Sequence, residues 1–141
     1  MRYFIDTNIF LRVFVKDNEK AFKECLVLLT IVKENKIEAY TSSIVLAEIN
    51  WTLGSYYHFS KPKTIRCIKS ILNLRGLKVE DKHEMIRALQ LYEKNSVKYI
   101  DAVIASDVDI LDKRATVVSF DKDFDKLKVL RKEPKQIIIP K

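Results

Sequence analysis

A carboxylate stands directly after the first predicted strand, in the sequence Arg2-Tyr3-Phe4-Ile5-Asp6. The aromatic and branched residues before Asp6 are typical of a buried strand. An acid at the end of such a strand is costly to remove from water unless a cation neutralises it. Open α/β sheets bind their ligands at the carboxyl ends of their strands. We therefore expect the chemistry of the chain at Asp6 and at the residues that join it there.

Three further acids occupy comparable positions. Glu48 lies about two turns into the helix that follows the second predicted strand. Asp101 opens a predicted helix, and Asp121 ends the fourth predicted strand. The ends of parallel strands and the starts of the following helices lie on one side of a sheet, so these carboxylates are expected to converge in one cleft with Asp6.

Four neighbouring carboxylates cannot all stay ionised unaided, because each charge raises the proton affinity of the others. A hard divalent cation relieves this repulsion, and carboxylates with waters suit Mg²⁺ or Mn²⁺. Metal ions held in this way lower the pKa of a bound water and clamp a phosphodiester. The four acids therefore predict a Mg²⁺ or Mn²⁺ site that acts on phosphate esters.

Each acid also has an ordinary structural interpretation. Asp6 and Asp121 are acceptable helix N-caps, and Asp101 suits the positive end of a helix dipole. Glu48 alone is typical of a solvated helix surface. Only the joint arrangement of the four favours a site over these separate roles.

The elements that must position the acids follow from hydrophobic periodicity. Two strands are predicted to end at Asp6 and at Asp121. Three more strands are predicted over residues 37–41, 77–79 and 136–139. Helices are predicted from Asp17 to about Asn35, from Ser42 or Ser43, from Ser60 to Gly76, after Asp81, and over 100–112. Strands that alternate with helices predict a three-layer α/β/α sandwich with a mostly parallel central sheet. The length predicts one domain over residues 1–141.

Three local features sharpen this picture. Val45, Ile49 and Leu53 recur at intervals of four and predict the buried stripe of the third helix, with Glu48 off that stripe. Gly54 in the same helix suggests a close backbone approach. Asp81 with Glu84 resembles a capping box for the helix that follows.

The ordered set of motifs resembles the PIN-domain ribonucleases, particularly the VapC-like toxins of toxin–antitoxin pairs. The matching segments span the chain in the expected order and are 4–8, 43–48, 99–105 and 119–124. The resemblance implies a PIN-like fold and a Mg²⁺- or Mn²⁺-dependent endoribonuclease. It also implies an antitoxin protein as partner and a homodimer.

The resemblance assigns roles residue by residue. Asp6, Glu48, Asp101 and Asp121 would be the catalytic, metal-binding acids. Asn8 and Ser119 would orient carboxylates or water, and Asp123 would be a fifth acid at the rim or a cap for the following turn. Many relatives carry Thr where this chain has Ser119, and the hydroxyl is retained.

The formal net charge of +7 favours a polyanionic partner, which here would be RNA. Six basic residues and no acid lie between Lys61 and Lys78. Candidates to contact the RNA backbone are Lys61, Lys63, Arg66 and Lys122. Ordinary solvated surface charges are the competing interpretation.

The cysteines and the lengths of the apolar runs indicate the cellular compartment of the protein. Cys25 and Cys67 form no metal-ligand pair and suit reduced thiols of a cytoplasmic protein. No apolar run is long enough to span a bilayer, and Asp6 interrupts any signal peptide.

Two other functions are compatible with the same fold and acids. One is a catalytically silent module that binds RNA or protein, and the other is a metal-dependent phosphatase.

Overall fold

Five parallel strands form the centre of the computed structural model, which describes residues 1–138. The sheet order is β3-β2-β1-β4-β5, and the strands are β1 (Arg2–Ile5), β2 (Glu38–Thr41), β3 (Leu77–Val79), β4 (Ala115–Val118) and β5 (Arg131–Lys132). Phe4 pairs with Tyr40 of β2, and Ile5 pairs with Val118 of β4. The carboxyl end of β1, where Asp6 follows, is therefore flanked by a strand on each side.

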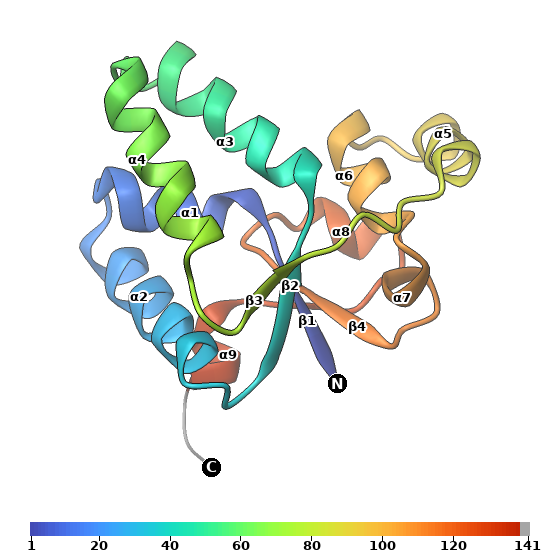
Figure 1. Ribbon diagram of the computed structural model, residues 1–141. Helices are drawn as coiled ribbons and strands as arrows, with labels where there is room; N and C mark the ends of the chain where they lie inside the picture. Colours follow the sequence, from blue (N-terminus) through green and yellow to red (C-terminus); the bar gives the residue numbers. More distant parts are fainter. Residues whose placement is uncertain (139–141) are drawn as a thin grey trace.

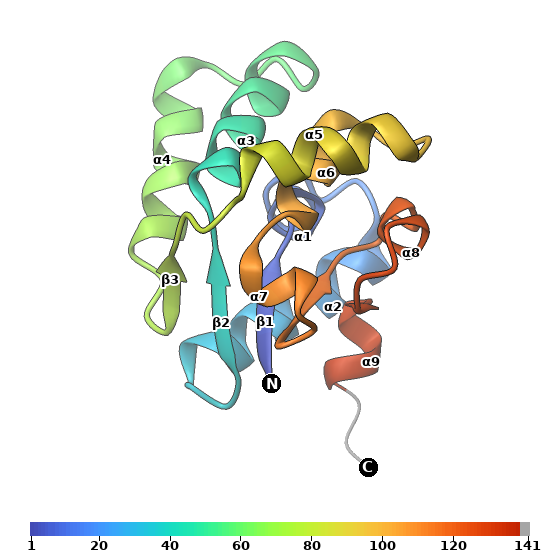
Figure 2. The ribbon, with the colours of Figure 1, turned by 90° about the vertical axis from the view of Figure 1, so that its right-hand side faces the viewer.

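Helices cover both faces of this sheet. On one side lie α1 (Thr7–Val15), α2 (Glu19–Lys33), α4 (Lys61–Leu72) and α9 (Pro134–Ile138) (Figure 1). On the other side lie α5 (Met85–Lys94), α6 (Tyr99–Ala105), α7 (Val108–Leu111) and α8 (Asp123–Lys126) (Figure 2). The helix α3 (Ser43–Ser55) leaves the carboxyl end of β2 and packs beside α1 and α4. This arrangement confirms the predicted α/β/α sandwich with a parallel sheet.

The central strands are buried on both faces. Phe4, Ile5, Tyr40, Val117 and Val118 are all fully buried, as expected for a parallel sheet with helices on each side. Their consecutive apolar side chains leave no polar face along β1 or β4. Asp6 follows the carboxyl end of β1, and the charged Arg2 lies at the opposite end of this strand.

The helix α3 is fixed by the stripe that the sequence predicts. Val45, Ile49 and Leu53 are fully buried, which leaves Glu48 to one side of the core-facing surface. The start of α3 is held by Asp81, which accepts hydrogen bonds from the Ser43 amide (2.8 Å) and the Ser43 hydroxyl (2.7 Å). The predicted capping box is therefore wrong, because Asp81 caps a helix from a distant segment rather than the one beside it.

Two predicted elements differ from the structure. The predicted helix over 100–112 is interrupted after Ala105, because buried Asp107 accepts hydrogen bonds from the amides of Asp109 and Ile110 and starts α7. The predicted strand over 136–139 is also wrong. Residues 136–138 belong to α9, whose first residue Pro134 has a backbone suited to a helix start, and residue 139 lies outside the described residues.

The two glycines behave differently. Gly76 has a φ of 88°, and a Cβ there would lie 2.2 Å from the carbonyl oxygen of Val32, so the turn into β3 requires glycine. Apart from its chain neighbours and the backbone of its own helix, no atom of the described residues lies within 4 Å of the Cβ position of Gly54. The close backbone approach predicted at Gly54 is therefore absent.

Other features bear on the class of protein. Cys25 is buried, Cys67 is partly buried, and both are free thiols. Among residues 1–138, no helix combines the length and apolar character needed to cross a bilayer.

Candidate metal centre

Asp6 is buried and firmly held where β1 ends. Only 4% of the residue is exposed. One carboxylate oxygen accepts a hydrogen bond from the Thr7 amide (2.8 Å), and the other accepts one from the Ser119 hydroxyl (2.7 Å). Asp6 is the N-cap of α1, and this role is compatible with its predicted role as a site acid. Burial raises its pKa to about 6, although both hydrogen bonds oppose that rise.

Asn8 and Ser119 connect β1 to the segment after β4. The Asn8 amide donates to the Ser119 hydroxyl oxygen (3.0 Å), and the backbone amide of Asp121 donates to the same oxygen (2.9 Å). The Asn8 carbonyl accepts a hydrogen bond from the Phe120 amide (3.3 Å). These bonds fix the loop that carries Asp121 relative to Asp6, which is the arrangement expected of residues that orient carboxylates.

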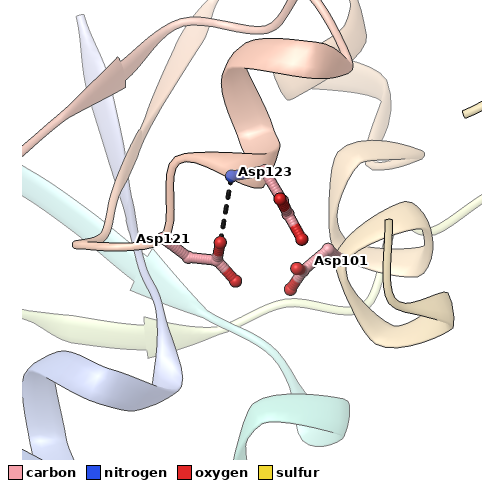
Figure 3. A group of neighbouring side chains, drawn as sticks. All are labelled: Asp101, Asp121 and Asp123. Carbon is pink, nitrogen blue, oxygen red and sulfur yellow. Dashed lines mark hydrogen bonds between the residues drawn. The ribbon is translucent and has the colours of Figure 1, made fainter. Parts of the chain in front are cut away.

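Three carboxylates point toward one another at the edge of the sheet (Figure 3). One oxygen from each of Asp101, Asp121 and Asp123 lies within 4.8 Å of the others. Asp101 comes from the first turn of α6, whereas Asp121 and Asp123 flank the start of α8. The Asp123 amide donates to Asp121 (2.9 Å), which turns this short segment back toward α6.

The pKa values of Asp101 and Asp121 are shifted in opposite directions. Asp101 is 3% exposed, and burial together with the nearby Asp121 carboxylate raises its pKa to about 8. Burial opposes ionisation of Asp121 as well, but the neighbouring Asp101, the Asp123 amide and Lys98 together hold its pKa below the ordinary value. Without a metal ion the pair therefore shares one proton near neutral pH.

All four predicted acids line one cavity of about 220 Å³. Glu48 reaches it from α3, where its carboxylate accepts a hydrogen bond from the Thr7 hydroxyl. The walls are completed by Thr7, Asn8, Leu11, Thr52 and Lys98. The structure thus brings together Asp6, Glu48, Asp101 and Asp121, and it places Asp123 closer to the last two than the sequence indicates.

Lys98 is the residue of this cavity that the sequence analysis missed. Its ammonium lies 3.2 Å from Asp121 and 4.0 Å from Asp101, while 64% of the side chain stays exposed. Its position three residues before Asp101 is the spacing at which helical side chains meet, so a search for i, i+3 partners would have found it. In the part of the chain that the structure describes, no other cation forms an ion pair with Asp101 or Asp121.

Of the candidate RNA-contacting residues, three lie on α4 and the fourth lies beside the acids. Lys61, Lys63 and Arg66 are exposed on α4, and Lys122 is exposed between Asp121 and Asp123. Within residues 1–138 none of these four forms a salt bridge. No acid of the described residues pairs with their charges, and their contact with RNA stays a prediction.

Comparisons with known proteins match the fold of this chain. The family model of the PIN domain matches residues 3–130. A chain of VapBC2 from Rickettsia felis, solved bound to a DNA fragment from their promoter, is similar with a TM-score of 0.65 and 21% identity, and the match covers 94% of this chain and 98% of that chain. No match was found among curated proteins.

A second solved structure shows the same fold. A chain of VapBC-1 from nontypeable Haemophilus influenzae has a TM-score of 0.65 and 15% identity, with 96% of this chain and 99% of that chain covered. At such low identities the agreement establishes the arrangement of helices and strands, and it leaves the chemistry to be argued from the residues themselves.

We expect the Asp101→Asn variant to be more stable than the original protein in EDTA at pH 8.5. The folded-state pKa of Asp101 is about 8, above the ~3.9 of an unfolded chain, so ionisation lowers the free energy of unfolding progressively from about pH 4 to pH 8. Asn cannot ionise and avoids that loss. Because one pKa unit corresponds to about 1.4 kcal/mol, the gain at pH 8.5 should be about 1 kcal/mol or more.

Urea denaturation at pH 5, 7 and 8.5 measures this difference, with exposed Asp112→Asn as the matched control. The control should show no comparable change with pH. Loss of stability in Asp101→Asn at pH 8.5 would mean that the carboxylate is a structural helix residue and that carboxylate crowding is absent.

Proposed function

This chain belongs to the PIN domain family, and we propose that it is a divalent-metal-dependent endoribonuclease that hydrolyses RNA phosphodiester bonds. The observation that carries the proposal is the convergence of Asp101, Asp121 and Asp123 within 4.8 Å at the carboxyl edge of the sheet. Asp6 and Glu48 line the cavity beside them. A single domain over residues 1–141 is part of this proposal.

The residues present suit a hard divalent cation. One oxygen of Asp101, Oδ2, is buried and has no hydrogen-bond partner among the described residues. A buried carboxylate oxygen without a partner is costly, and a cation would satisfy it. The surrounding donors are all carboxylate oxygens, which select Mg²⁺ or Mn²⁺ over metals that prefer nitrogen or sulfur ligands.

We assign the catalytic roles from this arrangement. Asp101, Asp121, Asp6 and Glu48 would hold the metal ions, with Asp123 as an additional acid. A bound Mg²⁺ or Mn²⁺ would supply an acidified water and stabilise charge on the phosphate. Ser119 and Asn8 fix the carboxylate of Asp6 and the loop of Asp121 by the hydrogen bonds described above. The Thr7 hydroxyl fixes the carboxylate of Glu48 by donating a hydrogen bond to it.

The substrate and partners follow from charge and fold. The surplus of +7 and the unpaired cations on α4 favour RNA as the polyanion that approaches the acidic cavity. Because the two solved structures described above are VapBC proteins, we propose that this chain is the toxin of a toxin–antitoxin pair and acts in the cytoplasm. An antitoxin would then be its protein partner.

We expect cleavage of a mixed pool of structured RNA with Mn²⁺ or Mg²⁺ and none with EDTA. The Asp101→Asn and Asp121→Asn variants should lose more than about 100-fold in initial rate. Ser119→Ala should lose about 10- to 100-fold, the range for residues that orient metal ligands. Asp112→Asn, which alters an exposed acid that does not line the cavity, should cleave like the original protein.

Two other outcomes would select the competing functions. RNA retained on the protein without cleavage under any metal would indicate a silent binding module. Faster turnover of small phosphomonoesters than of RNA would indicate a phosphatase that uses the same acids. Unchanged cleavage by both aspartate variants would contradict the site assignment.

Lys98 and the metal should compete for the same carboxylates. In the free protein the ammonium of Lys98 pairs with Asp121 and Asp101. A divalent cation must therefore displace this ammonium or bind against its electrostatic repulsion. Replacing Lys98 by Met should tighten Mn²⁺ binding by about five- to tenfold, the effect of one screened charge at a few ångströms. Calorimetric titration of the RNA-free protein with Mn²⁺ measures this directly.

Lys23→Met is the matched control, since it removes an equal charge from the exposed surface of α2, and its Mn²⁺ affinity should stay unchanged. Equal affinities for Lys98→Met and the original protein would show that the ammonium does not compete with the metal.

A homodimer stays a prediction of the family resemblance, and α5 offers the surface for it. Met85, Ile86, Leu89 and Tyr92 are exposed on this helix, with Ile86 79% exposed. Exposed apolar side chains that cluster on one helix are typical of a protein interface. We propose that two copies pack through α5.

The Ile86→Glu variant should therefore be a monomer of 16.5 kDa under conditions where the original chain is a dimer. Sedimentation velocity measures both species, and Lys94→Glu at the end of the same helix controls for the change of charge. A dimer that persists in Ile86→Glu would place the interface elsewhere.

A further inference from the structure

A second hollow lies between α3 and α4, separate from the acidic cavity. This α3–α4 pocket has a volume of about 340 Å³, and its lining includes Asn50, Trp51, Gly54, Phe59 and Lys61. Trp51 is the single tryptophan of the chain and is 67% exposed. A large aromatic side chain left open to solvent beside a hollow is not explained by packing of the core.

The α3–α4 pocket adjoins the acidic cavity across one helix. Glu48 and Thr52 of α3 line the acidic cavity. Trp51 and Ser55 follow them by three residues each and line the α3–α4 pocket. Side chains three residues apart on a helix are neighbours, with Cβ atoms about 5–6 Å apart. A flexible polymer held at the acids can therefore place its next unit in this pocket.

Gly54 keeps the α3–α4 pocket open. Its φ is not in the left-handed region, and within the described residues nothing lies within 4 Å of its Cβ position. Neither backbone conformation nor packing in the free protein thus requires glycine, although glycine in a helix is less stable than alanine. A methyl group at this position would project into the pocket that Gly54 lines. The residue is explained if a ligand occupies that space.

The chemistry of the pocket suits a nucleobase. The Trp51 ring is exposed for stacking, and Phe59 is covered by the ammonium of Lys63 at 4.0 Å from the ring centroid. The Asn50 amide can donate and accept hydrogen bonds at a base edge. Lys61 adds positive charge for the adjacent phosphate, and no acid occurs from Lys61 to Lys78.

We propose that the α3–α4 pocket binds an unpaired base of single-stranded RNA next to the phosphodiester at the acidic cavity. The base stacks on Trp51 and occupies the space above Gly54, and Lys61 holds the flanking phosphate. This inference rests on the proposed nuclease function, because it names a base-binding subsite for the same RNA. Cleavage would then require an unpaired nucleotide at this position.

The single tryptophan provides the readout. Single-stranded hexaribonucleotides of one base each (U, C or A) are titrated into the Asp101→Asn protein, which keeps the probe intact. Stacking on Trp51 should quench its fluorescence in a saturable way. Anisotropy of dye-labelled hexamers measures the affinity independently. The strength of quenching should differ among the three bases, since the pocket is formed by specific side chains.

The Gly54→Ala substitution, added to this background, separates a ligand role from a structural one. It should raise the melting temperature by about 2–5 °C, because alanine favours the helix. It should weaken hexamer binding by about tenfold, as loss of one stacked base does. Ala47→Ser, on an exposed part of α3 outside both hollows, should bind hexamers like its parent.

Two results would overturn the subsite. One is hexamer binding by anisotropy without a change in Trp51 fluorescence, and the other is unchanged affinity in Gly54→Ala. Either result can occur while the original protein still cleaves RNA, which would leave the nuclease proposal standing. Quenching and weakened binding in Gly54→Ala, with no cleavage by the original protein, would support the subsite and reject the nuclease.

Discussion

The central constraint on this structure is that two carboxyl groups, Asp6 and Asp101, are buried at the carboxyl edge of an apolar sheet, which costs free energy when they are ionised. Burial raises the pKa of both carboxyl groups, to about 6 and about 8. Hydrogen bonds from Thr7 and Ser119 offset part of the cost at Asp6, and the ammonium of Lys98 offsets part of it at Asp101. Among the described residues, both oxygens of Asp6 accept hydrogen bonds, whereas Oδ2 of Asp101 has no hydrogen-bond partner, and that unsatisfied oxygen supports our proposal of a cation in this cavity.

A second group of charges, which are partly buried, forms a structural network in the same molecule. Arg2 at the start of β1 donates to Glu80 and Asp109, and Lys82 pairs with both acids. Lys82 and Arg114 lower the pKa of Asp109 to about 2. Each acid there has fixed cationic partners and a lowered pKa. The raised values at Asp6 and Asp101 are the opposite, which is the pattern expected of a functional site.

Much of the fold and of the candidate site could be predicted because it rests on local pattern. The apolar runs before Asp6 and Asp121 specify buried strands, and the spacing of Val45, Ile49 and Leu53 specifies one face of α3. Parallel pairing then brings the strand ends together. These steps need only the periodicity of the chain and the direction of its strands.

The remainder depends on contacts between distant segments. Asp81 caps α3 and not its own helix, because the end of β3 lies beside the end of β2. β5 has only two residues, and Arg131 of this strand forms ion pairs with Asp125 and Glu133. A pattern of alternating hydrophobicity cannot predict a strand of this kind. Lys98 neutralises Asp121 across a gap of 23 positions in the sequence, and that pairing becomes visible only when α6 packs against α8.

The packing of α3 links the acidic cavity to the α3–α4 pocket. The stripe of Val45, Ile49 and Leu53 fixes the rotation of this helix about its axis. That single rotation points Glu48 at the acids on one flank and Trp51 toward the neighbouring pocket. Because adjacent residues on a helix are 100° apart, a small rotation would misplace both side chains together. The core residues of α3 therefore set the distance between the acidic cavity, where we propose that a phosphodiester binds, and the α3–α4 pocket, where we propose that a base binds.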